Sequence, residues 1–509
     1  MLARKTTLLL VTIVLGLTLV HTCALCDESV VRGGELVVAI GADPTTIDPH
    51  MTTTDAFQNA FNASVYIPLI EATPDGFKPA VAETWEFVDD GMGLVLHLRE
   101  GLTWHNGKPI TPEDIKWNLD RVLDPDQGSP WRPQISPIDH VEIIDATTIK
   151  LHLQYATPTI LDGLTFVMLV LQEGLENDDP IGCGPFKFEE WVPGSHILHK
   201  RFEGYFNPDL PYLDAVRMTI VGDPETRLAQ LEAGSVDVAR EPSPKDYSRI
   251  DDNSELKLVF SAPGANRSAY YGWTKWPGNN LLVRNAIEHC IDKVAYVNEG
   301  FYGYADLNAS LYDRSNWAWN PEAVKLERKY DLQKAKALFA QAGYPRSDDP
   351  PLVILVLAGL PDFEISAVQL QSALRDIGIS SEIVKRDAAA WYDMLIERPQ
   401  RWDFAYTGYN YGVRDPYFML TTDLAHEETN LGRFVFPGYR QLREAAAAVF
   451  EQEDRQVLYN LIQEVTIREN LYLILCHFSY VVGAQDYVQG LFFDNTISIT
   501  RYDKAWMSQ

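Results

Sequence analysis

The chain has 509 residues, with 43 lysines and arginines against 71 aspartates and glutamates, so its formal net charge is −28. This length is too great for one compact core and predicts at least two lobes, and the hydrophobic fraction of 46% excludes a wholly disordered chain. Such an acidic surface repels phosphate backbones and anionic lipid headgroups, which disfavours roles on nucleic acid or at a membrane surface.

The N-terminus carries a short basic segment followed by an uncharged apolar run. Arg4 and Lys5 precede residues 6–20, which hold no charged side chain, and small residues follow around Ala24. This order is typical of a secretory signal peptide, so we expect residues 1–26 to be a leader that exports the chain. The apolar run is too short to span a membrane comfortably, and no later stretch of about 20 apolar residues occurs.

Five cysteines occur, two of them in the leader. Cys23 and Cys26 are candidates for a lipid anchor, although neither follows the usual leucine-alanine-glycine triplet; otherwise we expect plain cleavage before Val30. The remaining cysteines are widely spaced and form no CxxC pair, which argues against zinc and thioredoxin-like sites. We expect them to be buried thiols, with at most one disulfide among them: Cys183, Cys290 and Cys476.

Short strands and hairpins dominate the first third of the chain. The apolar run 35–40 ends at Gly41 and predicts a buried strand. Thr111 is followed by proline, glutamate and Asp114, a combination of cap, N1 proline and acidic first turn that predicts a helix start. Turn residues separate two pairs of apolar runs that predict hairpins: 85–88 with 94–98, and 140–144 with 148–153.

Helices and strands alternate in the rest of the chain. After a strand predicted at 351–357, a helix over 364–377 stops at Gly378, and a strand follows at 381–384. This β-α-β order implies parallel pairing within an α/β lobe. Apolar spacing, caps and glycine stops predict further elements: helices at 224–234, 283–295, 331–343, 441–450 and 455–469, and a strand at 236–238. No glycine/serine-rich linker separates the parts, which favours several chain crossings and a hinge.

The motifs of common enzyme classes are absent from the sequence. It contains no GxSxG, HExxH or GxxxxGK[ST], and no GxGxxG after a strand. Of the eleven histidines only His105 has a notable setting, and the Asn106-Gly107 step beside it indicates a turn rather than a catalytic site. We therefore expect a protein that is not an enzyme and that needs no cofactor or metal.

A series of short motifs runs in a fixed order from Gly33 to Pro416. They lie at residues 33–40, 43–44, 47–49, 69–71, 79–85, 96–107, 111–115, 182–186, 231–237, 283–287, 292–293 and 415–416. One such motif alone is a weak signal, but the whole ordered set resembles the bacterial extracellular solute-binding proteins of family 5. These are the receptors of peptide/nickel-type ABC importers.

The resemblance implies an α/β fold in two lobes that close on a ligand. The expected class is the periplasmic-binding-protein fold, type II and cluster C-like, with an extra mainly β domain inserted beside lobe I. By analogy the domains are 33–60, 181–265 and 480–509 for lobe I, 61–180 for the extra domain, and 266–479 for lobe II. The turn at 182–185 then lies at a crossing between domains. The predicted elements agree, because hairpins concentrate before Gly182 and the β-α-β order comes after residue 351.

The resemblance leaves the ligand open, because such receptors carry peptides, nickel chelates, sugars or opines. In peptide-binding relatives an aspartate shortly before the Asp-Pro step holds the peptide α-amine. Here that position falls near Gly412, with Arg414 close by. A cation at this place repels an ammonium group, which argues against a free peptide N-terminus there unless Asp415 substitutes.

The chain around this step is rich in aromatic residues. Trp391 and Tyr409 resemble positions where relatives place cleft-lining tryptophans, whereas packing of the lobe is the structural alternative. The residues predicted to bind the ligand are Trp273, Trp391, Tyr409, Asn410, Tyr411, Arg414 and Asp415.

These observations favour a receptor on the periplasmic or extracellular face of the cell membrane. We expect it to capture a peptide-like solute between its lobes and to deliver it to an ABC permease in the membrane, as a monomer and without nucleic-acid partners. An oligosaccharide receptor of the same family and an extracellular hydrolase are the alternatives. A nickel receptor is disfavoured because no histidine cluster lies near the predicted cleft.

Overall fold

The computed structural model describes residues 30–62, 64–73, 76–397, 400–410, 415–420, 434, 436–494 and 499–508. The predicted leader, Tyr411 and Arg414 lie outside the described residues. For Tyr409 and Asn410 the structure describes the backbone alone.

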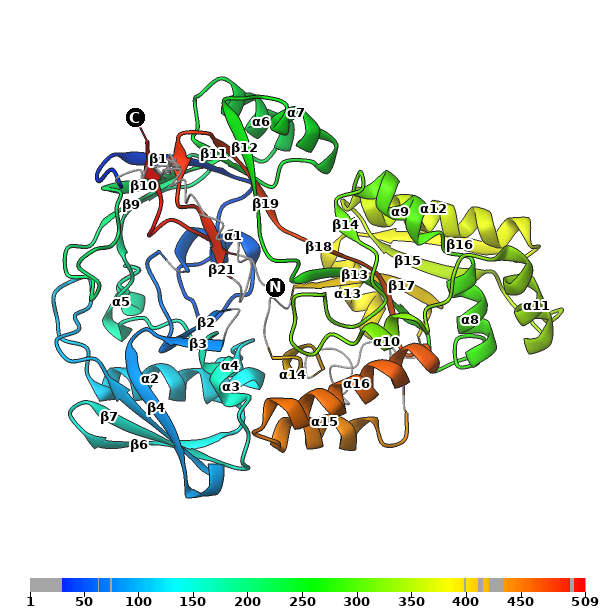
Figure 1. Cartoon of the computed structure of the whole chain (residues 1–509), viewed down its shortest axis with the longest axis horizontal. Coiled ribbons are helices and arrows are strands. Elements are labelled where there is room, and N and C mark those ends of the chain that lie inside the picture. Colours follow the sequence, from blue (N-terminus) through cyan, green and yellow to red (C-terminus); the bar gives the residue numbers. More distant parts are fainter. Residues whose placement is uncertain are drawn as a thin grey trace, which may run out of the picture.

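Two large sheets form the two halves of the molecule, which we call lobe I and lobe II (Figure 1). Lobe I has a seven-stranded sheet in the order β12 (Leu256–Phe260), β19 (Val481–Gln485), β11 (Val238–Arg240), β1 (Glu35–Ile40), β10 (Ala215–Ile220), β9 (His196–Arg201) and β8 (Phe186–Val192). Its helices are α1 (Asp55–Phe61), α6 (Pro224–Glu232) and α7 (Tyr247–Asp251), and Leu175 of the short helix α5 (Gln172–Glu176) packs against its core. Strand β1 pairs in parallel with both β10 and β11.

Lobe II is built on a six-stranded sheet. The strand order is β14 (Ala305–Asp306), β18 (Leu473–Phe478), β13 (Ala265–Tyr271), β17 (Phe404–Asn410), β15 (Leu352–Leu357) and β16 (Ser381–Arg386). Its helices are α8 (Leu281–His289), α9 (Lys293–Gly300), α10 (Pro321–Val324), α11 (Leu332–Ala342), α12 (Pro361–Asp376), α13 (Ala388–Ile396), α14 (Tyr417–Met419), α15 (Tyr439–Ala448) and α16 (Gln452–Arg468). The parallel pairing of β15 with β16 confirms the β-α-β order predicted there.

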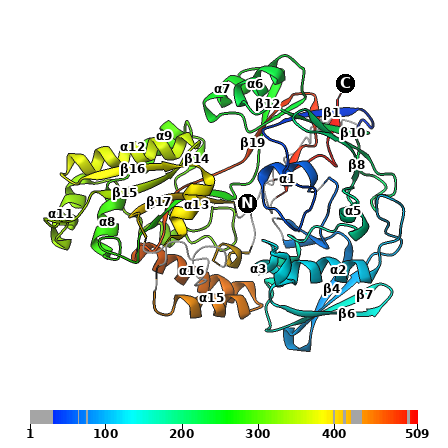
Figure 2. The same cartoon turned by 180° about the vertical axis from the view of Figure 1, so that it is seen from behind.

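The chain crosses between the sheets twice, at neighbouring places. Strand β12 of lobe I leads into β13 of lobe II, and β18 of lobe II leads back into β19 of lobe I (Figures 1 and 2). The two crossing segments are hydrogen-bonded to each other: the Ser261 N–H donates to the Tyr480 carbonyl (2.9 Å) and the Tyr480 N–H to the Ser261 hydroxyl (2.9 Å). Two short, paired connections without a flexible linker are the arrangement expected of a hinge.

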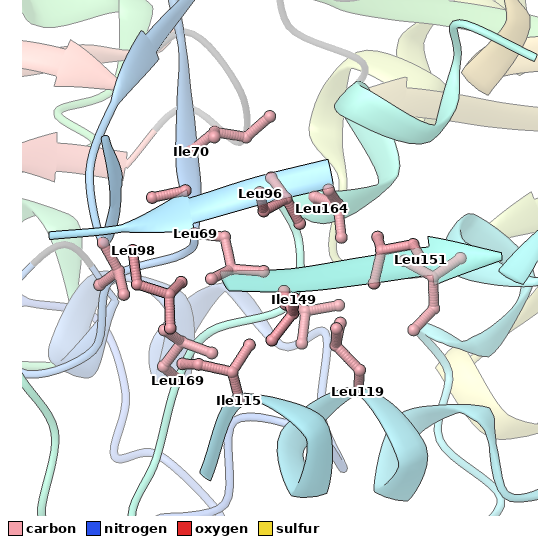
Figure 3. Close-up of a cluster of buried hydrophobic side chains, with 14 of the residues drawn as sticks. Leu69, Ile70, Leu96, Leu98, Ile115, Leu119, Ile149, Leu151, Leu164 and Leu169 are labelled. Carbon is pink, nitrogen blue, oxygen red and sulfur yellow. The ribbon is translucent and has the colours of Figure 1, made fainter. Parts of the chain in front are cut away.

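A smaller four-stranded sheet packs below lobe I and forms what we call the four-stranded domain (Figure 1). It runs in the order β4 (Ala82–Val88), β5 (Gly93–Leu98), β7 (Thr148–Leu153) and β6 (Ile138–Asp145), with helices α2 (Pro112–Leu123), α3 (Arg132–Ile135) and α4 (Ile160–Leu164). Helix α2 presents Ile115 and Leu119 to the inward side chains of β5 and β7 (Figure 3). The predicted cap is present, because the Thr111 side chain accepts from the Asp114 N–H and the Asp114 carboxylate accepts from the Thr111 N–H.

Three two-stranded sheets complete the part of the chain that the structure describes. They pair β2 (Ile70–Thr73) with β3 (Gly76–Pro79), β20 (Val488–Gln489) with β23 (Trp506–Met507), and β21 (Phe492–Asp494) with β22 (Ile499–Arg501). In the part of the chain that the structure describes, no helix combines the length and apolar character needed to cross a bilayer.

Two sequence-based predictions need correction. The helix predicted over 283–295 is two helices, α8 and α9, because the Asp292 carboxylate accepts from the Ala295 N–H and starts a new helix there. The strand predicted at 236–238 forms only from Val238 onward, where it pairs with β1.

The three cysteines outside the leader are buried and free, as predicted: Cys183, Cys290 and Cys476. Burial raises the pKa of the Cys290 thiol to about 12, which makes this thiol a packing group rather than a nucleophile.

His105 has the structural role expected of it. Its Nδ1 accepts from the Gly182 N–H (3.3 Å), and its Nε2–H donates to the Gly184 carbonyl (3.1 Å). Both ring nitrogens are therefore occupied, and burial lowers the pKa of the ring to about 4.

Candidate ligand-binding cleft

The carboxyl ends of the parallel strands in lobe I lie beside the crossing segments. Strands β1, β10 and β11 all end at one edge of the sheet. At that edge the Glu241 N–H donates to the carbonyl of Val481, the first residue after the second crossing (3.1 Å). In open α/β sheets, ligands bind outside the carboxyl ends of the strands.

In lobe II, too, the carboxyl end of a parallel strand lies beside the crossing segments. Strand β15 is parallel to β16 and β17, and β17 ends at Asn410. Asn410 is the register partner of Ala265, which itself pairs with Phe478 on the other side. Ala265 follows the first crossing and Phe478 precedes the second, so the backbone of Tyr409 and Asn410 ends beside the crossing segments.

A cavity of about 320 Å³ lies at the carboxyl edge of lobe I. Its lining residues are Ile40, Gly41, Ala42, Asp55, Ala56, Asn59, Gly222, Arg227, Arg240 and Glu241. They come from the ends of β1, β10 and β11 and from the first turn of α1. The cavity therefore occupies the position where the strand topology predicts a ligand.

Charged groups of opposite sign line this cavity. The Arg227 guanidinium donates to four backbone carbonyls, those of Val221 (2.8 Å), Gly222 (3.1 Å), Arg240 (2.9 Å) and Glu241 (3.3 Å). It thereby neutralises the exposed carbonyl ends of the strands. The Arg240 guanidinium pairs with the Glu241 carboxylate at 3.4 Å.

Asp55 and Glu241 both line this cavity, and each carboxyl group affects the pKa of the other. Withdrawal from water raises the pKa of Asp55 to about 7, and the neighbouring Glu241 acts in the same direction against the opposing effect of Arg240. For Glu241, withdrawal from water also acts upward, but Arg240 and the neighbouring Asp55 carboxyl lower its pKa below the usual range. At neutral pH the Glu241 carboxyl group is therefore ionised, whereas that of Asp55 is partly protonated.

The residues predicted to bind ligand occupy different surroundings. Trp273 stacks on the Arg284 guanidinium (3.5 Å to the ring centroid), and its Nε1–H donates to the Leu471 carbonyl (3.3 Å), so this side chain packs lobe II. Trp391 is half-buried against the core cluster that contains Leu395 and Trp402, and its buried Nε1–H has no hydrogen-bond partner.

Asp415 has a carboxylate that is already occupied. Its Oδ2 pairs with the Arg455 guanidinium at 2.5 Å, and its Oδ1 accepts from the Tyr459 hydroxyl (3.2 Å) and the Tyr417 N–H (2.9 Å). Both members of the ion pair have side chains only 7% exposed. This geometry argues against the predicted contact of the Asp415 carboxylate with a ligand and gives the residue a structural role within lobe II.

Lobe II also touches the four-stranded domain at the rim opposite the hinge. The Asp415 N–H donates to the Asp162 carboxylate (3.1 Å), and the Thr157 hydroxyl donates to the Ala447 carbonyl (2.9 Å). The rings of Phe87 and Phe450 meet edge to face, 5.0 Å between centroids. Lobe II is thus in contact with the rest of the molecule both at the crossing segments and at this rim.

The sequence interpretation missed Asp55, Arg240 and Glu241. Arg240 and Glu241 directly follow a predicted strand, and charged residues at such a place are a signal of a site at the carboxyl edge. Asp55 gave no such signal, because only the fold brings the start of α1 to that edge. Among the described residues no group of three potential metal ligands occurs.

Most of the chain matches a known protein family, and this match identifies the class of protein. Residues 76–430 match the model described as "Bacterial extracellular solute-binding proteins, family 5 Middle". The chain belongs to this family. Its function is therefore that of a substrate-binding receptor of an ABC importer on the periplasmic or extracellular side of the membrane, and not that of an enzyme.

Family 5 relatives match over most of the chain. The glutathione-binding protein GsiB of Escherichia coli O1:K1 / APEC is 25% identical over 489 residues, 92% of each chain. Heme-binding protein A of Haemophilus influenzae is 26% identical over 478 residues, 85% of each chain. The solved structure of the periplasmic binding protein DppA from Helicobacter pylori, in complex with the peptide STSA, superposes with a TM-score of 0.81 at 24% identity and covers 94% of this chain and 99% of its own. The two-lobed fold of this family 5 protein is thus that of the periplasmic binding proteins.

Proposed function

We propose that the chain captures a peptide-like solute in the cleft beside the hinge and releases it to the permease of its importer. The observation that carries the proposal is the convergence of two carboxyl strand edges on one pair of crossing segments, with a polar cavity of about 320 Å³ at that place. The relatives support the peptide class, since GsiB is named for glutathione, a small peptide, and DppA was solved with a peptide. An oligosaccharide is the second candidate, because the aromatic residues around Tyr409 suit flat sugar faces equally well.

We propose that the signal peptide and the domains have the boundaries predicted from the sequence. Residues 1–26 serve as the signal peptide, with or without a lipid anchor at Cys23 or Cys26. Lobe I takes 33–60, 181–265 and 480–509, the extra domain 61–180 and lobe II 266–479. We further propose that the protein acts as a monomer without nucleic-acid partners, in keeping with its net charge of −28.

The proposed ligand contacts in lobe II are Trp391, Tyr409, Asn410, Tyr411 and Arg414. Support for Trp391 comes from its unpartnered Nε1–H, and for Tyr409 and Asn410 from the end of β17 beside the hinge. Across the cleft we add Asp55, Arg240 and Glu241 of lobe I.

Native mass spectrometry of the exported protein, purified without denaturant, tests the proposal. We expect an extra mass of a few hundred daltons that is lost on unfolding and that fragments as a peptide, because closed clefts of this kind retain their solute through purification. A retained hexose oligomer would favour the second candidate. Turnover of the released solute by the pure protein would contradict a receptor function.

A further inference from the structure

The four-stranded sheet carries two stacked histidines on its outer face. Val141 of β6 and Leu151 of β7 are buried in the core of the domain. Because side chains alternate along a strand, His140 and His152 point to the opposite face. These two residues are direct register partners, and their rings are parallel to within 8° with centroids 4.2 Å apart. Two imidazoles therefore lie in contact on the side of the domain that is remote from the crossing segments (Figures 1 and 2).

Each of the two rings has a carboxylate at one nitrogen. His140 Nδ1 lies 2.8 Å from the Asp139 carboxylate, and His152 Nε2 lies 2.7 Å from the Glu142 carboxylate. An ionised carboxylate only accepts hydrogen bonds, so each neutral ring carries its proton on the nitrogen that faces the carboxylate. In the part of the chain that the structure describes, the other two nitrogens, His140 Nε2 and His152 Nδ1, have no hydrogen-bond partner. They thus present two lone pairs on neighbouring strands.

The charges around the two rings favour a cation. The hydrogen bond from His152 lowers the pKa of the Glu142 carboxyl group, so this group is ionised at neutral pH. Lys150 is the register partner of Glu142, but its ammonium group lies 2.6 Å from the Asp89 carboxylate, which balances its charge. The carboxylates of Asp139 and Glu142 therefore leave the surroundings of the rings negative.

We propose that His140 Nε2 and His152 Nδ1 bind one divalent transition-metal ion, with water completing its coordination. Imidazole nitrogens suit zinc, copper and nickel, and a metal-bound histidine almost always donates its other N–H to a partner such as a carboxylate. Both rings have this arrangement. Two nitrogen ligands of a tetrahedral Zn²⁺ lie about 3.3 Å apart. Rings with centroids 4.2 Å apart and side chains 56% and 30% exposed reach one ion by turning about their side-chain bonds.

This metal site is separate from the capture of solute. Its residues belong to β6 and β7 of the four-stranded domain, whereas the ligand cavity lies at the carboxyl edge of lobe I. Strand β6 is the outer strand of its sheet and pairs only with β7. An ion held by one side chain from each strand therefore joins the edge strand to its neighbour and stabilises the folded domain by binding to it.

Titration of Zn²⁺ into the exported, untagged protein tests the site. We expect isothermal calorimetry to show one ion bound per chain, and His140→Gln and His152→Gln each to weaken the binding by at least about 10-fold, since each removes one of two ligands. Glu142→Gln leaves both ligands in place but removes the charge that orients His152, so it should weaken binding by about 10- to 100-fold. Circular dichroism checks that the variants fold.

His196→Gln is the matched control and should bind Zn²⁺ as the wild type does. His196 Nε2 also faces a carboxylate, that of Glu190 at 2.9 Å, but its Nδ1 contacts the Ser195 hydroxyl at 3.0 Å. Failure of the wild-type protein to bind Zn²⁺ would overturn the inference, as would undiminished binding by both His140→Gln and His152→Gln. Anomalous diffraction at the zinc edge gives a second check that needs no variant, because its peak should lie between these two rings, and a peak only elsewhere would refute the site.

Discussion

The ion pair between Asp415 and Arg455 is enclosed on all sides, with 7% of each side chain exposed. We expect Asp415→Asn to lower the free energy of unfolding by about 3–5 kcal/mol, because it leaves the Arg455 charge buried without a partner. Urea denaturation measures the loss. Glu453→Gln, an exposed acid on the same helix as Arg455, is the control and should change stability by less than about 0.5 kcal/mol.

Binding measurements on the same variant separate structure from recognition. If Asp415 acts only within lobe II, the folded fraction of Asp415→Asn binds solute with unchanged affinity. A large loss of affinity with unchanged stability would restore Asp415 to the ligand contacts that the sequence predicts.

His199 predicts a sensitivity of the fold to acid. The ring is fully buried against Phe61 and Phe188, neither nitrogen has a hydrogen-bond partner, and burial lowers its pKa to about 3. A histidine with a lowered pKa stabilises the fold above the unfolded pKa near 6.5, and this contribution is lost as the pH falls towards the folded value. At pH 4 the loss amounts to about 3 kcal/mol for this residue.

The variant His199→Leu therefore should lose less stability on acidification than the wild-type protein does. Urea midpoints measured between pH 7 and pH 4 test this, with the exposed His140 replaced by glutamine as the control. Parallel pH profiles for wild type and His199→Leu would show that another group governs acid unfolding. Three further buried histidines with pKa values lowered to about 4 add to the wild-type slope: His50, His105 and His477.

Residues of the site were harder to predict than the function. A motif signal pointed to the segment around Tyr409, and the end of β17 does lie beside the hinge. Asp55 has no motif of its own, and Glu241 is 186 positions away, so only the tertiary fold brings both residues to one cavity. Carboxylates are too common in this acidic chain for any pair to be picked out by type alone.

At the scale of elements, the turn that contains Gly182 fixes the four-stranded domain to lobe I. The Gly184 N–H donates to the Val65 carbonyl (2.9 Å), and the His105 N–H to the Gly182 carbonyl (2.9 Å). A Cβ atom on Gly182 would lie 2.0 Å from the Val65 carbonyl oxygen. The close approach of two backbones, and not the φ angle, is what requires glycine here.

We expect Gly182→Ala to cost about 3 kcal/mol or more of unfolding free energy, since neither backbone can move without breaking these hydrogen bonds. Gly343→Ala is the matched control. Gly343 caps α11 with φ +71° and has open space around its Cβ position, so the cost there is conformational and about 1–2 kcal/mol. Equal losses in the two variants, measured by thermal unfolding, would mean that the turn adjusts freely.

Elements with a cap or stop in the sequence were the ones that could be predicted. The hairpins, α2, α11 and β1 have such local signals and form where expected. The division of 283–295 was missed because its apolar spacing runs on through Cys290, whereas the capping bond of Asp292 interrupts the helix. Pairing across the two crossings depends on contacts far apart in sequence, which no local pattern encodes.

At the scale of the molecule, the crossing segments and the rim contacts differ in what they hold together: the crossing segments connect the two lobes, and the rim contacts join lobe II to the four-stranded domain. We expect the crossing segments to stay bonded to each other when the lobes move apart, because Ser261 and Tyr480 both belong to the connection. The contacts at the rim exist only while the lobes are together, since they join lobe II to the four-stranded domain. We therefore expect the rim contacts to set the balance between open and closed forms without contributing to the stability of either lobe.

Phe450 offers the clearest test of this balance. Its ring lies in the short connection between α15 and α16, is 41% exposed and meets Phe87 across the rim. Phe450→Ala removes a contact of about 1 kcal/mol that only the closed form makes, so the ratio of closed to open forms should fall by about five-fold and the apparent affinity for solute should fall by up to that factor. Small-angle scattering should show a larger radius of gyration for the variant than for the wild type at the same subsaturating solute concentration, and an equal one at saturation.

Leu461→Ala, an exposed apolar residue of α16 (45% exposed), is the control and should alter neither quantity. An unchanged affinity for Phe450→Ala would show that the rim contact does not contribute to closure, and a radius of gyration that stays the same with and without solute in the wild type would contradict hinge closure itself.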